Sequence, residues 1–149
     1  MRYKMSAKLL WQVCIADADG KAISISTDPF VGRSHDSIYH AYPRFLLRWF
    51  NEQLRENLYL PWEQVEGFEP LYVHIANTHH WRLNEVRQMK LEEDELLNFL
   101  RPELRHLTLE QAVIDAVLQE SGDALPREVK ADLLRRLGNA LSTPEKSLQ

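Results

Sequence analysis

A stripe of large apolar side chains within residues 35–57 constrains the fold of this chain more than any other feature. The stripe has spacings of four, three and four residues and consists of Ile38, Tyr42, Phe45 and Trp49. This spacing is typical of an α-helix with one apolar face. Because aromatic side chains remove much apolar surface from water when they are buried, we predict a core helix here. Pro43 lies inside the stripe and predicts a break or kink near Tyr42.

The N-terminal segment predicts a β-hairpin. Apolar residues alternate with other residues in 7–15 and again in 21–26, and an Asp-Gly dipeptide lies between the two runs. Alternation is typical of half-buried strands, and Asp-Gly is a strong signal for a two-residue hairpin turn. A third strand is predicted at 71–76, which is rich in β-branched and aromatic residues. A weaker pattern at 80–86 predicts a strand that pairs back on it.

The second half of the chain predicts helices. We expect one helix at 91–100, one at 109–119 that starts with a capping box and ends at Gly122, and a last one from Pro126. Strands in the first half and helices in the second favour an α+β fold over a doubly wound parallel sheet. The predicted architecture is one or more N-terminal antiparallel hairpins packed on the central aromatic-rich helix, followed by a helical C-terminal part.

Length and cysteine content predict a single domain in the cytoplasm. We assign residues 1–141 to one α+β domain and residues 142–149 to a disordered tail, since 149 residues suit one core. Cys14 is the single cysteine, which fits a reducing compartment. The apolar run that follows the basic N-terminus is too short for an export signal, and we read it as a strand. No stretch approaches the roughly twenty apolar residues of a membrane span, so no membrane association is expected.

The charge distribution does not indicate direct binding to nucleic acid. The formal net charge is -4, and the excess of acidic residues lies in residues 61–149. Nucleic-acid binders normally carry a basic stripe, and we find none. The acidic run Glu92–Glu95, together with Glu103 and Glu110, leaves one alternative: an acidic protein that mimics nucleic acid to inhibit a partner. The same run also suits the start of a helix, because the helix dipole favours negative charge there.

Histidines provide a second alternative function. His74 at the end of a predicted strand and His80 after a tight turn would bring two imidazoles together, and imidazole is a common zinc ligand. With a nearby acid they would form a small metal-dependent hydrolase or nuclease that uses zinc or manganese. No HExxH, CxxC, GxSxG or phosphate-binding glycine motif is present. We therefore expect no catalytic residues and no cofactor unless this histidine pair binds a metal.

Aromatic and arginine side chains in irregular or edge segments predict a protein-binding surface. We expect it to consist of five residues: Tyr59, Trp62, Trp81, Arg82 and Arg87. Tyr, Trp and Arg dominate the energetics of protein interfaces. The preferred hypothesis is a small cytosolic binding or regulatory protein that acts through protein–protein contacts. A homodimer remains open, because the last two helices can pack within one chain or between two.

Overall fold

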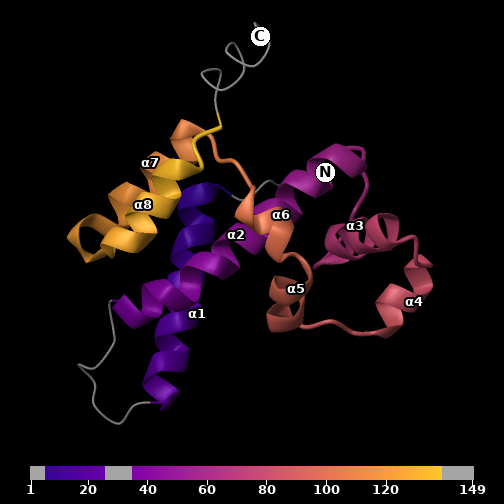
Figure 1. Cartoon of the computed structure of the whole chain (residues 1–149), viewed down its shortest axis with the longest axis horizontal. Helices are drawn as coiled ribbons and strands as arrows, with labels where there is room; N and C mark the ends of the chain where they lie inside the picture. Colours follow the sequence, from indigo (N-terminus) through magenta and orange to yellow (C-terminus); the bar gives the residue numbers. More distant parts are fainter. Residues whose placement is uncertain (1–5, 26–34, 139–149) are drawn as a thin grey trace, which may run out of the picture.

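The computed structural model describes residues 6–25 and 35–138, and the regular structure in this part is helical (Figure 1). The helices are α1 (Ala7–Ile25), α2 (His35–Leu58), α3 (Glu69–His79), α4 (Leu83–Gln88), α5 (Glu93–Phe99), α6 (Arg101–Arg105), α7 (Gln111–Ser121) and α8 (Arg127–Arg135), with the 3-10 helix η1 (Gly122–Ala124) between the last two. The described residues contain no strand. One isolated parallel β-bridge connects Leu109 and Leu137. The predicted α+β fold is therefore wrong.

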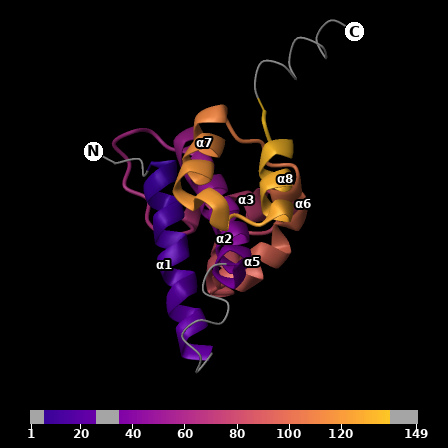
Figure 2. The same cartoon turned by 90° about the vertical axis from the view of Figure 1, so that its left-hand side faces the viewer.

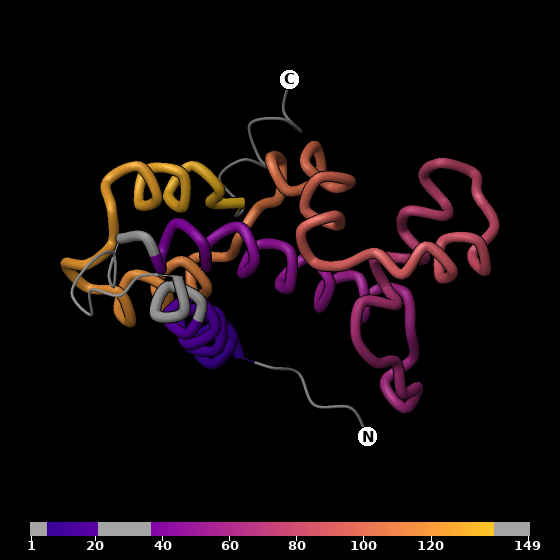
Figure 3. The backbone as a smooth tube through the Cα atoms, turned by 90° about the horizontal axis from the view of Figure 1, so that it is seen from below, coloured from indigo at the N-terminus to yellow at the C-terminus, as the bar shows by residue number. Residues whose placement is uncertain are grey.

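Helix α2 is the central element, as its apolar stripe predicted. The four stripe residues are all buried: Ile38, Tyr42, Phe45 and Trp49. The helix continues through Pro43 as one element of 24 residues. In Figures 1 and 3, α2 runs through the middle of the molecule, with α7 and α8 toward one end and α3 and α4 at the other.

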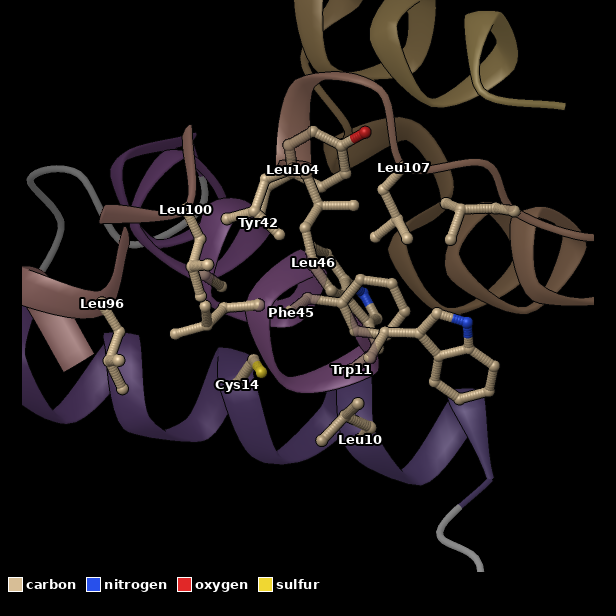
Figure 4. Packing of buried hydrophobic residues seen from close by; sticks show 14 of the residues in the cluster. Leu10, Trp11, Cys14, Tyr42, Phe45, Leu46, Leu96, Leu100, Leu104 and Leu107 are labelled. Carbon is tan, nitrogen blue, oxygen red and sulfur yellow. The ribbon is translucent and has the colours of Figure 1, made fainter. Parts of the chain in front are cut away.

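Helix α1 replaces the predicted N-terminal hairpin. Its buried residues are Leu10, Trp11, Cys14 and Ala18, whereas Leu9 of the predicted strand is 48% exposed. These buried positions follow the helical period, which a short apolar run can satisfy as well as it satisfies alternation. Packing on α2 and α7 selects the helix: the Trp11 ring meets the Phe45 ring edge to face at 5.5 Å (Figure 4). Figure 2 shows α7 between α1 and α8.

Helix α3 replaces the strand predicted at 71–76, and α4 covers most of the strand predicted at 80–86. The residues of α3 that face the core are Leu71, Ile75 and Ala76, which follow the helical period. Pro70 in the first turn and Glu69 before it are both favourable at a helix start. The tertiary contacts of this face outweigh the strand propensity of its β-branched and aromatic residues.

The predicted C-terminal helices are confirmed, with shifted ends. Helix α7 begins later than predicted, with Glu110 rather than Thr108 at its N-cap, and ends at Gly122, which has φ of 54°. Helix α8 follows Pro126. The predicted tail at 142–149 lies outside the described residues. Among the helices that the structure describes, none has the length and apolar character needed to cross a membrane.

Candidate protein-binding surface

A groove of about 890 Å³ lies where the connection after α2 meets α3 and α4. We call it the α3–α4 groove. Its lining residues are Leu58, Tyr59, Gln64, Val65, Glu66, Glu69, Val73, Leu83 and Arg87. Figure 3 shows the connection, residues 59–68, extending from the end of α2 before the chain returns into α3. The groove therefore lies at the end of the molecule opposite α7 and α8.

Hydrogen bonds from α2 and within the connection hold residues 59–68 in place. Asn51 Nδ2 and Arg55 Nη2 donate to the carbonyl oxygen of Gly67 at 3.0 and 2.8 Å. Gly67 has φ of 61°, in the left-handed region that favours glycine. Nearer the tip, the Glu63 backbone N–H donates to the Leu60 carbonyl at 3.0 Å, and the Leu60 N–H donates to Glu63 Oε1 at 3.2 Å. This wall of the groove is therefore held in position by hydrogen bonds within the chain.

The last residue of α2 and the connection present large apolar side chains to solvent. Trp62 is 70% exposed, Leu60 is 50% exposed and Leu58 is 44% exposed. The prediction that Trp62 is available for binding is consistent with this exposure. Single exposed apolar residues are ordinary, but several that lie together on a surface are typical of interaction sites.

An ion pair joins α3 and α4 beside the groove. Arg87 Nε donates to the two carboxylate oxygens of Glu69 at 3.0 and 3.2 Å, and Nη1 donates to Asn84 Oδ1 at 3.2 Å. Burial and then the Glu69 carboxylate raise the pKa of the Tyr59 hydroxyl, while Arg87 opposes this. Tyr59 and Arg87, predicted together from the sequence, therefore share one groove with Glu69.

The remaining predicted aromatic residue, Trp81, belongs to a different cluster. Its ring stacks on His79 at 4.8 Å and meets the edge of Phe99 at 6.1 Å, and it is 39% exposed. Arg82 is exposed at the N-cap of α4, where its backbone N–H donates to Glu85 Oε1 at 3.3 Å. Of the five predicted residues, Tyr59 and Arg87 line the α3–α4 groove, whereas Trp62, Trp81 and Arg82 do not.

The structure places His74 and His80 on and just after α3, not at a strand end and a hairpin turn. His74 lies with Nε2 2.7 Å from Glu103 Oε2, and its ring packs against Phe50 at 5.3 Å. His80 is exposed and has φ of 59°. Within residues 6–25 and 35–138, no group of three or more His, Cys, Asp or Glu side chains is arranged to hold a metal ion. Metal binding by His74 and His80 stays a prediction.

The acidic run at 92–95 has contacts within the protein. Glu93 pairs with Arg48 at 2.8 Å and with Arg44 at 3.5 Å, and Asp94 pairs with Arg44. The Glu92 backbone N–H donates to the side chain of Glu95 at 2.9 Å. Two of the four acidic side chains are thus engaged by α2, and a third caps the start of α5.

Sequence reasoning missed the apolar and acidic residues that complete the groove. Val73 and Leu83 line it, but both lay in segments predicted as strands, so their common surface was not foreseen. Leu58 and Leu60 carried a usable signal, because they flank Tyr59 in an apolar run next to a proline. Comparisons with models of protein families, with curated proteins and with solved structures find no match to this chain.

Proposed function

We propose that this protein acts by binding another protein in the cytoplasm, through the α3–α4 groove and the exposed apolar residues beside it. The observation that carries the proposal is the 70% exposure of Trp62 on the connection that forms one wall of the groove. A fully exposed aromatic ring costs free energy in water, and burying it in a partner recovers that cost. The cytoplasmic location rests on the single cysteine.

The shape of the groove supports an extended or helical peptide segment as the occupant. Apolar side chains line both walls, with Tyr59 and Val65 from the connection and Val73 and Leu83 from α3 and α4. A partner segment that places one apolar side chain between these walls buries surface on both sides. The hydrogen bonds to Gly67 hold one wall in position, which lowers the entropy that binding must overcome.

The charges of the groove favour a basic partner segment. Arg87 is engaged by Glu69, whereas Glu66 is exposed and makes no side-chain hydrogen bond or ion pair with the described residues. A Lys or Arg side chain on the partner would therefore meet an uncompensated carboxylate. Such complementarity selects partners and speeds association more than it adds affinity. The expected ligand is an apolar segment that carries a basic residue.

A selection of displayed random peptides on the immobilised protein tests the proposal directly. We expect enriched peptides to combine apolar and basic residues and to lose binding to Trp62→Ala, because hot-spot aromatics contribute about 2 kcal/mol or more. Leu134→Ala is the matched control, since Leu134 is 48% exposed on α8, far along the chain from the groove. Peptides that bind both variants equally, or no enrichment, would contradict the proposal.

A second copy of the chain is the competing occupant, and its test is the molecular mass in solution. We expect light scattering after size exclusion to give the same mass for the unaltered protein and for Trp62→Ala. A dimer that Trp62→Ala converts to a monomer would show that a second copy fills this surface. That result would overturn binding of a different protein as the function of the groove.

A further inference from the structure

A second groove, of about 790 Å³, opens between α2, α5, α6 and α8. We call it the arginine groove after four of its lining residues, Arg101, Arg105, Arg135 and Arg136. None of its lining residues belongs to the α3–α4 groove. An inference about the arginine groove is therefore independent of the proposed function.

The arginine groove has an excess of positive charge. Asp132 is its one acidic lining residue, and its carboxylate accepts hydrogen bonds from Tyr42 Oη at 2.6 Å, Arg135 Nη2 at 2.8 Å and Arg136 Nε at 2.8 Å. Burial by itself raises the pKa of Asp132, but these hydrogen bonds outweigh burial and lower it to about 2. One carboxylate against four guanidinium groups leaves three positive charges uncompensated among the lining residues.

Arg136 is a buried hydrogen-bond donor in the lining of the arginine groove, and most of its nitrogens are held by the protein. Its exposed fraction is 6%, and Nη1 donates to the carbonyl oxygen of Leu107 at 3.0 Å and to that of Leu104. Nε is held by Asp132 and by Tyr42 Oη, at 2.8 and 3.2 Å. None of the described residues accepts a hydrogen bond from the remaining nitrogen, Nη2. Nη2 is not among the fully buried atoms that lack a partner, so it is open to water or to a ligand in the groove.

Arg101 and Arg105 bring further charge without a counter-ion. They lie four residues apart on α6, where side chains are neighbours and like charges repel. Arg101 Nε donates to the neutral amide of Asn98 at 3.1 Å. The Arg105 side chain makes no hydrogen bond or ion pair with the residues that the structure describes. A bound anion would remove the repulsion between these two guanidinium groups.

Apolar residues form the rest of the lining: Pro43, Leu46, Leu97 and Leu104. The groove thus combines several guanidinium groups with a nonpolar wall, and its volume falls in the range of roughly 300–1,000 Å³ usual for small-molecule sites. One guanidinium group can donate two parallel hydrogen bonds to two oxygens of the same phosphate. A phosphate monoester carries close to two negative charges, which the arginines would compensate. We propose that the arginine groove binds a small organic phosphate, with its phosphate on the arginines and its nonpolar body against Pro43 and the leucines.

Isothermal titration calorimetry with three probes at constant ionic strength tests this proposal on the full chain. The probes are phenyl phosphate, inorganic phosphate and phenol, which separate the contributions of the phosphate and of the nonpolar body. We expect phenyl phosphate to bind one site per chain at least about tenfold more tightly than either other probe, as the loss of one group of contacts implies. No binding of phenyl phosphate at millimolar concentration would overturn the proposal. Equal affinity for inorganic phosphate would overturn the assignment of an organic ligand.

Two variants and a matched control locate the bound phosphate. Arg105→Gln and Arg101→Gln should each weaken phenyl phosphate binding about tenfold, because each removes a charge-assisted hydrogen bond. Both should keep the thermal midpoint of the ligand-free protein, since neither side chain holds the core. Arg127→Gln, at the start of α8 and outside the lining, should bind as the unaltered protein does. Equal weakening by all three variants would show general charge attraction and overturn a site in this groove.

The proposals for the two grooves can be tested independently of each other. Trp62→Ala should leave phenyl phosphate binding unchanged, and Arg105→Gln should leave binding of the selected peptides unchanged. Loss of phenyl phosphate binding in Trp62→Ala would place the phosphate outside the arginine groove and overturn this inference.

Discussion

A tryptophan is buried toward one end of α2, and another is exposed beyond the other end. Toward α1 and α7, Trp11 is 1% exposed, packs on Phe45 and donates from Nε1 to Ser121 Oγ at 2.9 Å. Beyond the other end, Trp62 is 70% exposed. Burial of a tryptophan within the chain stabilises the fold, whereas an exposed one leaves that free energy to be gained on binding. The comparison separates a region that stabilises the fold from an exposed region, where we propose that a partner binds.

Trp11→Ala should have the largest effect on stability. Removing a buried tryptophan leaves a cavity and an unpaired Ser121 hydroxyl, so we expect the free energy of unfolding to fall by about 3–5 kcal/mol. Urea denaturation followed by circular dichroism measures this change. Trp11→Phe keeps most of the apolar volume and should lose clearly less. A loss below about 1 kcal/mol for Trp11→Ala would mean that this end of α2 is not the stabilising region.

Arg136→Met should have the next largest effect. The substitution removes the Arg136 donor from the carbonyl oxygens of Leu104 and Leu107, and it removes one of the three side chains that donate to the Asp132 carboxylate. Breaking a buried charged network of this kind costs about 3 kcal/mol. Arg135→Met is the control on the next residue, because Arg135 is 52% exposed and exposed ion pairs contribute about 1 kcal/mol or less. Equal losses in the two variants would contradict a structural role for Arg136 beyond its charge.

Asp132→Asn should show that the same network depends on pH. The pKa of Asp132 is lowered from 3.8 to about 2 in the folded protein, so its ionised form stabilises the fold above pH 3.8. That contribution is lost as the pH falls from about 4 to about 2. We expect the difference in free energy of unfolding between the unaltered protein and Asp132→Asn to shrink across this window. A constant difference in acid titrations of urea denaturation would contradict the assignment.

Trp62→Ala should have the smallest effect on stability although it removes peptide binding. An exposed side chain with few contacts changes the free energy of unfolding by about 0.5 kcal/mol or less. Trp81→Ala sharpens the comparison, because Trp81 is 39% exposed but packs against His79 and Phe99. We expect this substitution to lower the free energy of unfolding by about 1 kcal/mol. If Trp62→Ala destabilises more than Trp81→Ala, the two tryptophans have exchanged roles and the proposed surface is wrong.

Sequence patterns predicted the elements whose periodicity has one interpretation. The stripe that includes Phe45 and Trp49 extends over three turns, so only a helix places those residues on one side. Residues 7–15 form a shorter run in which alternation and the helical period both fit. The predicted hairpin was wrong there, because contacts of Trp11 with Phe45 and Ser121 favour a helix over a strand. Phe45 and Ser121 both lie far from Trp11 in the sequence.

The candidate site also has a part that the sequence predicted and a part that only the structure shows. Composition predicted Tyr59, Trp62 and Arg87 as candidate binding residues, since aromatic and arginine side chains dominate the energetics of protein interfaces. It could not identify Glu69 as the partner of Arg87, 18 residues away, or separate Trp81 from the groove. Those relations follow from the packing of α4 against α3.

By itself, the sequence determined that the chain has a core helix within residues 35–57, further helices in its second half and aromatic side chains near residue 60. Tertiary structure alone decided that α1 and α3 are helices, and that Tyr42 meets Asp132 and Arg136 across 90 and 94 residues. The physical reason is that sequence periodicity depends on residues within a few helical turns of each other. Burial of a helix face or strand face depends instead on contacts with residues far away in the sequence. A segment whose apolar residues fit both strand alternation and the helical period adopts the structure that buries its apolar face against the rest of the protein.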